Sequence, residues 1–118
     1  WVKDKGTWYF MNDKGVMFNQ TWLYQGGNWY AFKSSGAMIA SDWLYDNHSW
    51  YYLKDSGSMA TGWIKNSGSW YYLNNSGSMA TGWVKDSGSW YYLASSGKML
   101  HSTYTPDGYY VDASGAWK

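Results

Sequence analysis

A unit of about 20 residues recurs five times along this chain of 118 residues. A Gly-x-Met step returns at intervals of 21, 21, 20 and 20 residues, beginning with Gly15, Gly36, Gly57, Gly77 and Gly97. Two tryptophan series keep the same intervals, and the two members within a unit are always seven residues apart: Trp1 and Trp8, Trp22 and Trp29, Trp43 and Trp50, Trp63 and Trp70, Trp83 and Trp90. Such self-similarity indicates a repeat architecture, in which neighbouring units cover one another's apolar faces.

Each unit has the pattern of a β-hairpin. An aromatic and β-branched stretch at 63–65 meets a turn cluster at 66–69, and a second strand pattern follows at 70–73. No stretch has an apolar period of 3.6 residues long enough for a helix. A lone hairpin is only marginally stable in water, so the units must stack. We therefore predict an all-β fold, a β-hairpin solenoid with a superhelical stack of five repeats (1–21, 22–42, 43–62, 63–82 and 83–101) and a divergent terminal hairpin at 102–118.

The composition limits both the core and the function. Aromatic residues make up 23% of the chain while aliphatic residues are scarce, so we expect stacked rings rather than an aliphatic core to supply most of the buried area. There is no cysteine for a disulfide or a thiolate metal site. A net charge of +1 without any arginine argues against nucleic-acid binding, and no apolar run is long enough for membrane insertion.

The terminal segment 102–118 departs from the repeat. When Gly115 is aligned with Gly97, Tyr109 falls under Tyr91 and Trp117 falls where Met99 stood. Terminal repeats are commonly atypical because they cap the stack, so we interpret this segment as a cap or a homodimerisation surface. We also expect the chain to be the C-terminal module of a longer exported protein, with any signal peptide or catalytic domain lying upstream.

The recurring rings suggest a binding site at each junction between units. Side chains alternate faces along a strand, so Trp63 and Trp70 of one unit can meet Tyr91 of the next. Three rings form a cage that suits a quaternary ammonium group, each ring contributing about 0.5–2 kcal/mol. After the free-energy cost of association is subtracted, the expected affinity of each site is roughly millimolar. A polymer that carries many ligands would bind more tightly, because it can occupy several sites at once. The alternative, that the same rings are only a structural stack, stays open on periodicity alone.

Other chemistry is thinly represented. Asp42, Asp46 and His48 lie close in sequence, but the other units have no counterpart of this trio, so we interpret it as turn decoration rather than a metal or acid–base site. No residue pattern provides a nucleophile with a base or a pair of catalytic carboxylates. We therefore expect a binding module, without a catalytic site, metal or cofactor.

The repeat motifs themselves are specific. The repeated pattern strongly resembles the choline-binding repeat of surface proteins and cell-wall hydrolases from Gram-positive cocci and their phages. It consists of Thr61-Gly62-Trp63, a turn, Trp70-Tyr71-Tyr72-Leu73 and then Ser76-Gly77-Ser78-Met79-Ala80. The ending at 109–117 is similar to that family's common C-terminus. The resemblance spans the whole chain. It implies an extracellular module at the bacterial cell surface that binds choline or phosphocholine on teichoic or lipoteichoic acid without covalent bonds.

The resemblance also implies the site residues. Each family site takes both tryptophans of one repeat and the tyrosine after the second-strand tryptophan of the next. The matching sets are Trp1, Trp8 and Tyr30; Trp22, Trp29 and Tyr51; Trp43, Trp50 and Tyr71; Trp63, Trp70 and Tyr91; and Trp83, Trp90 and Tyr109. By the same resemblance, four methionines line the sites: Met38, Met59, Met79 and Met99. Gly108 stands where a further tryptophan would be, so no sixth complete site is expected.

Two alternatives remain at this point. Related aromatic repeats occur in extracellular glucan-synthesising enzymes, which makes a glucan-binding module the second hypothesis. Sugar sites need hydrogen-bonding partners beside their ring platforms, and the repeated motif supplies few beyond Ser and Asn in turns. The third hypothesis is a structural or dimerisation stalk that binds no ligand.

Overall fold

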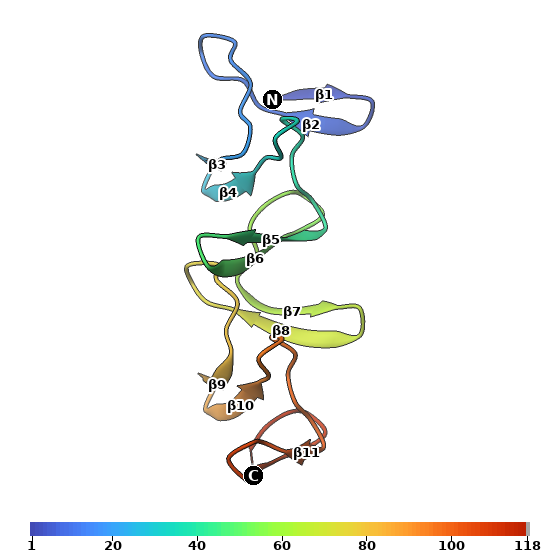
Figure 1. The fold of residues 1–118 in the computed structure, drawn as a ribbon, viewed down its shortest axis with the longest axis vertical. Coiled ribbons are helices and arrows are strands. Elements are labelled where there is room, and N and C mark those ends of the chain that lie inside the picture. Colours follow the sequence, from blue (N-terminus) through green and yellow to red (C-terminus); the bar gives the residue numbers. More distant parts are fainter. Residues whose placement is uncertain (118) are drawn as a thin grey trace. The chain divides into compact units, whose positions relative to one another are not determined.

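The computed structural model describes residues 1–117, and in this range every regular element is a β-strand. The strands form six two-stranded antiparallel sheets, each made of two strands consecutive in the chain (Figure 1). The described residues therefore include no helix long and apolar enough to cross a membrane. The predicted all-β fold of repeated hairpins is confirmed. The chain divides into two compact units, Trp1–Ala60 and Thr61–Lys118, which we describe separately.

The first unit contains three hairpins. Their strands are β1 (Val2–Asp4) with β2 (Thr7–Tyr9), β3 (Trp22–Gln25) with β4 (Asn28–Ala31), and β5 (Asp42–Asp46) with β6 (Ser49–Leu53). A second, smaller turn follows each hairpin and is closed by a bridge that ends on a methionine, as between Phe32 and Met38 or Leu53 and Met59. Each repeat of the first unit thus turns the chain twice.

The second unit repeats this arrangement. Its strands are β7 (Gly62–Asn66) with β8 (Ser69–Leu73), β9 (Gly82–Asp86) with β10 (Ser89–Leu93), and β11 (Thr103–Tyr104) with β12 (Tyr110–Val111). The last pair is shorter, and the bridge that follows it joins Val111 to Trp117, where Leu93 and Met99 are joined one repeat earlier. The predicted boundaries of the five repeats and of segment 102–118 remain a prediction.

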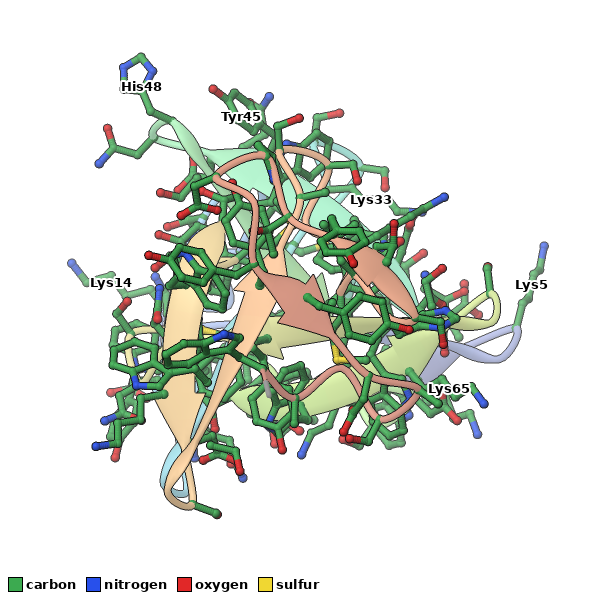
Figure 2. All side chains as sticks on the ribbon, turned by 90° about the horizontal axis from the view of Figure 1, so that it is seen from below. Lys5, Lys14, Lys33, Tyr45, His48 and Lys65 are labelled. Carbon is green, nitrogen blue, oxygen red and sulfur yellow. The ribbon has the colours of Figure 1, made fainter. Side chains whose placement is uncertain are left out.

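The hairpin tips explain why the turn clusters are rich in Ser, Asn and Gly. Asn66 pairs with Ser69, which leaves a loop of only Ser67 and Gly68, with φ values of 51° and 82°. Two successive positive φ angles define the turn whose twist matches that of the flanking strands, and glycine adopts them without steric penalty. In the third hairpin His48 takes the glycine position with φ 68°, and its side chain points away from the ribbon (Figure 2).

The largest completely buried side chains are aliphatic. Leu53, Leu73, Leu93 and Val111 are completely buried, whereas the second-strand tryptophans remain 39–43% exposed. The three leucines are the last residues of strands β6, β8 and β10. The rings form a half-exposed layer around this core, with Trp63 packed edge-on against Tyr72 at 5.0 Å between ring centroids.

Four glycines, Gly36, Gly57, Gly97 and Gly115, each lie directly beneath a methionine, whereas an added Cβ at Gly15 would meet nothing within 4 Å. A Cβ atom added to Gly115, where φ is 90°, would lie 2.5 Å from the sulfur of Met99. Gly36 and Gly57 face Met17 and Met38 in the same way. Close approach of the thioether to the backbone therefore requires glycine in the Gly-x-Met step.

This contact leads to a matched pair of substitutions. Gly115→Ala should lower the free energy of unfolding by about 2–3 kcal/mol, because a strained φ and a displaced Met99 act together. Gly108 has the same φ of 90° but nothing within 4 Å of an added Cβ, so Gly108→Ala should show the backbone penalty alone, about 1 kcal/mol. Urea unfolding of both variants measures the difference, and equal losses would mean that the Met99 contact contributes nothing.

Candidate functional site

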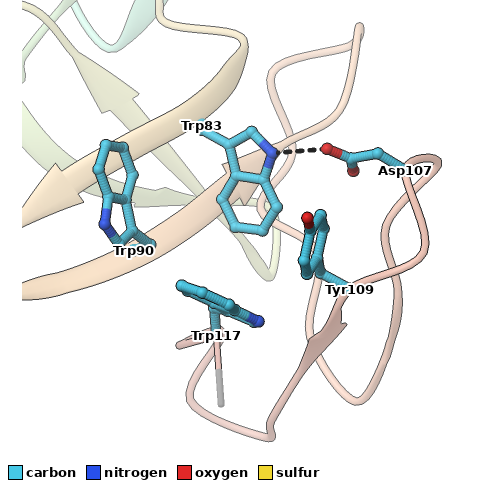
Figure 3. A pocket seen from close by; sticks show the side chains of 5 residues that line it. All are labelled: Trp83, Trp90, Asp107, Tyr109 and Trp117. Atoms are coloured by element: carbon cyan, nitrogen blue, oxygen red, sulfur yellow. Dashed lines mark hydrogen bonds between the residues drawn. The ribbon is translucent and has the colours of Figure 1, made fainter.

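Four aromatic rings surround a pocket at the end of the second unit (Figure 3). Trp83 lies 6.5 Å from Trp90, 5.9 Å from Tyr109 and 6.3 Å from Trp117, measured between ring centroids, and all three contacts are edge-on. Tyr109 and Trp117 are 5.4 Å apart. The open pocket has a volume of about 370 Å³, and its fifth lining residue is Asp107. Ring faces therefore make up most of the wall.

The positions of these rings follow from the hairpins that carry them. Trp83 lies on β9 and Trp90 on the paired strand β10, with both side chains on one face of the hairpin. Tyr109 immediately precedes β12, in the next hairpin. The backbone N–H of Trp117 donates to the carbonyl of Trp90 at 2.8 Å, which fixes the fourth ring against the pocket. Two successive hairpins are thus needed to build one pocket.

A carboxylate holds one edge of this pocket. The indole Nε1 of Trp83 donates to Oδ2 of Asp107 at 3.0 Å, and the hydroxyl of Thr105 donates to Oδ1 at 2.6 Å. The Thr105 hydrogen bond, followed by the Trp83 hydrogen bond, lowers the pKa of Asp107 below its ordinary value. The carboxylate therefore stays ionised at neutral pH and orients the Trp83 ring that it binds.

An equivalent pocket lies one repeat earlier in the second unit. Trp63 is 6.5 Å from Trp70 and 5.1 Å from Tyr91, again edge-on. The backbone N–H of Met99 donates to the carbonyl of Trp70 at 2.8 Å, and the Met99 side chain lines the pocket, whose volume is about 320 Å³. Met99 here occupies the position that Trp117 takes in the terminal pocket.

The first unit contains the same arrangement at its first two hairpins. Trp1 lies 6.3 Å from Trp8 and 5.0 Å from Tyr30, and Met38 joins them around a pocket of about 280 Å³. The backbone N–H of Met38 donates to the carbonyl of Trp8 at 2.9 Å. The structure thus brings together this predicted ring set and its methionine.

The next predicted set is brought together in part within the first unit. Trp22 lies 5.2 Å from Tyr51, and the backbone N–H of Met59 donates to the carbonyl of Trp29 at 2.8 Å. The remaining set is divided, since Trp43 and Trp50 belong to the first unit and Tyr71 and Met79 to the second. That set stays a prediction.

Two kinds of residue at these sites were missed by reasoning from the sequence. Trp117 was aligned with Met99 but not named as a site residue. The aspartates were the second omission: the indoles of Trp22, Trp63 and Trp83 donate to Asp46, Asp86 and Asp107 respectively, at 3.0–3.1 Å. The interpretation of Asp46 as turn decoration without counterpart was therefore wrong. The available signal was that Asp46 and Asp86 each stand three residues after a first-strand tryptophan.

The other members of that trio have local roles. A side-chain oxygen of Asp42 accepts the backbone N–H of Trp43 at 2.8 Å, and His48 lies in the exposed hairpin tip. Residues 1–117 contain no group of three or more His, Cys, Asp or Glu side chains that could hold a metal ion. The candidate binding sites in residues 1–117 are therefore the ring pockets.

Comparison with known families matches the repeats directly. The choline-binding repeat matches residues 44–81 and 60–104, and a putative cell wall binding repeat matches residues 1–17 and 20–38. A search of curated proteins gave no match.

Similar solved structures belong to the same group of proteins. Choline binding protein F from Streptococcus pneumoniae is 42% identical over 100% of this chain, with a TM-score of 0.86, and the chain spans 39% of its length. The multimodular pneumococcal cell wall endolysin from phage Cp-1, complexed with choline, is 39% identical over 100% of this chain and 36% of its own, with a TM-score of 0.75.

A smaller relative is matched over nearly its full length. The choline binding domain of Spr1274 from Streptococcus pneumoniae is 43% identical over 68% of this chain and 95% of its own, with a TM-score of 0.62. The repeats, the ring pockets and these matches agree, and the chain belongs to the choline-binding repeat family.

Proposed function

We propose that this chain is a non-catalytic module that anchors its protein to the bacterial cell wall by binding choline or phosphocholine groups on teichoic or lipoteichoic acid. The observation that carries this proposal is a recurring pocket in which two tryptophans of one hairpin, the tyrosine of the next hairpin and a methionine or a further tryptophan surround one space. The relative from phage Cp-1 was solved with choline, which supports the same ligand here.

The chemistry of the pockets favours a cation without N–H groups. Ring faces carry partial negative charge and attract a cation, and a quaternary ammonium is easily desolvated because it makes no hydrogen bonds. Carboxylates that touch the rings do so through indole N–H groups at the ring edge, as Asp86 does with Trp63, so the carboxylates do not cover the ring faces. A glucan would instead require several polar groups aimed at its hydroxyls.

In this proposal the module works at the extracellular face of the cell wall, through several weak contacts. Each pocket has roughly millimolar affinity for a single choline, and a polymer that carries many choline groups engages several pockets of one chain at once. Any enzymatic activity of the whole protein would then be directed to the wall by this module.

We further propose that the terminal hairpin supports self-association. Tyr104 and Tyr110 form an edge-on pair at 5.1 Å on β11 and β12 and remain 68% and 40% exposed. Sedimentation equilibrium of the chain and of Tyr104→Ser, with and without choline, tests this directly. A monomer under all conditions contradicts the dimer without affecting the binding proposal.

The binding proposal is tested by titration with three ligands, followed by tryptophan fluorescence and thermal unfolding. Choline should quench fluorescence and stabilise the fold at millimolar concentration, whereas dextran should do neither. The decisive control is 3,3-dimethylbutanol, which has the shape of choline without its charge and should bind at least tenfold more weakly. A response to dextran would support a glucan module, no response to any ligand would support a stalk, and equal binding of the neutral alcohol would remove the cation–π basis.

Trp117 gives a prediction specific to the terminal pocket. Trp117→Met restores the residue that Met99 contributes one repeat earlier, and it should weaken choline binding at the terminal pocket by about threefold to tenfold, because one ring face is lost. Calorimetric titration of the full chain should show one class of sites weakened and the others unchanged. Met99→Leu is the control, and it should alter binding less because neither side chain has a ring.

A further inference from the structure

The residue opposite each second-strand tryptophan divides the first five hairpins into two kinds. In three hairpins this cross-strand partner is a lysine: Lys3 pairs with Trp8, Lys65 with Trp70 and Lys85 with Trp90. In the other two hairpins it is a tyrosine: Tyr24 pairs with Trp29 and Tyr45 with Trp50. Directly opposed residues of a hairpin project from the same face, so the partner always flanks the indole.

The ammonium groups of these lysines lie over the indole rings in cation–π contacts. The Nζ atoms of Lys3, Lys65 and Lys85 lie 5.6, 5.9 and 5.9 Å from the ring centroids of their partner tryptophans. In the tyrosine hairpins the rings are 5.0 Å apart and tilted by 52–54°, with Tyr24 58% and Tyr45 55% exposed (Figure 2 shows Tyr45). In a hairpin of the first kind the indole that lines a pocket thus has a positive charge beside it, whereas in a hairpin of the second kind the indole has a neutral phenol beside it.

This charge affects the two ends of a choline phosphodiester in opposite ways. The lysine shares its indole with the ligand and repels the quaternary ammonium, which weakens the binding of free choline. The phosphate is only two carbon atoms away from that nitrogen and stays at the open mouth of the pocket, where an exposed lysine can reach it. A charge-assisted hydrogen bond from Nζ to a phosphate oxygen then favours the diester.

Resting on the function proposed above, we propose that Lys3, Lys65 and Lys85 make the pockets that contain Trp8, Trp70 and Trp90 selective for choline carried on a phosphodiester over free choline. The lysines act at the rim as specificity determinants, while the rings supply the affinity.

The test compares two ligands on the full chain by calorimetry: choline, and glycerophosphocholine as a zwitterionic phosphodiester. The triple variant K3Q/K65Q/K85Q removes the three rim charges. Its matched control, K5Q/K14Q/K33Q, removes three exposed lysines that have no ring partner among the described residues, and Lys5 and Lys14 point outward from the ribbon (Figure 2). Both variants change the net charge equally, so long-range effects cancel.

The expected result is a change in the ratio of the two affinities. The rim variant should lose about threefold of its preference for glycerophosphocholine over choline, and it should bind choline itself slightly more tightly, whereas the control should keep the ratio of the unmodified chain. In about 1 M NaCl the ratios of all variants should converge, because the screening length falls to about 3 Å.

The outcomes separate this inference from the proposed function. Absence of choline binding in the unmodified chain overturns the proposed function. Normal choline binding with the same ligand ratio in the rim variant and the control overturns only the role of the lysines. If the unmodified chain binds choline-bearing teichoic acid but not phosphatidylcholine vesicles, the source of the diester is the polymer. If the chain binds the vesicles, the source is the lipid headgroup.

Discussion

Leu93→Ala should lower the free energy of unfolding by about 3 kcal/mol, within the 2–5 kcal/mol typical of such truncations in a core. Leu93 is completely buried, pairs with Gly82 at the inner end of its hairpin and forms a bridge with Met99. The truncation leaves a cavity that the surrounding backbone cannot fill, because strands on either side are held by hydrogen bonds. Urea unfolding followed by tryptophan fluorescence measures the loss.

The control for this substitution is Val16→Ala. Val16 is 58% exposed, so its truncation should change the free energy of unfolding by no more than about 0.5 kcal/mol. A loss below about 1 kcal/mol for Leu93→Ala would mean that the ring layer, not the leucines, holds the repeats together.

Trp83→Ala should have the second large effect, on both folding and binding. The Trp83 ring contacts four others, those of Trp90, Tyr92, Tyr109 and Trp117, and its indole N–H is bonded to Asp107. Its removal should lower the free energy of unfolding by about 3–5 kcal/mol and abolish the terminal pocket. Calorimetry with choline should then show one ligand fewer per chain than the unmodified protein.

Trp83→Phe separates the ring from its hydrogen bond. Phenylalanine keeps an aromatic face in the pocket but cannot donate to Asp107, so the number of choline groups bound should be unchanged while stability falls by about 1–2 kcal/mol. If Trp83→Ala instead kept the full number of bound ligands, the terminal ring set would not be a choline site.

The sequence was sufficient to predict the hairpins and most of the ring sets, because both depend on regular spacing. Turn residues such as Ser67 and Gly68 place the tips, and alternation along a strand places Trp63 and Trp70 on one face. Tyr91 reaches them because the next hairpin repeats the same register. The fixed repeat spacing therefore predicts contacts between neighbouring units as well as contacts within one unit.

What the sequence did not reveal depends on distances between side chains that the period does not encode. Trp117 was matched to a methionine by counting, but only its hydrogen bond to the Trp90 carbonyl shows that a fourth ring enters the pocket. The indole bonds to Asp46, Asp86 and Asp107 span 23 or 24 residues, slightly more than one period.

The backbone bonds from Met38 to Trp8 and from Trp117 to Trp90 join successive hairpins at the very residues that line a pocket. A ligand held there interacts with two repeats only while they remain docked, so its binding free energy adds to their coupling. At ten times the dissociation constant this amounts to about 1.4 kcal/mol per occupied pocket. A wall dense in ligand would thus lengthen the cooperative unit of the array, and an array released into dilute medium would fray from its ends and become more susceptible to proteases.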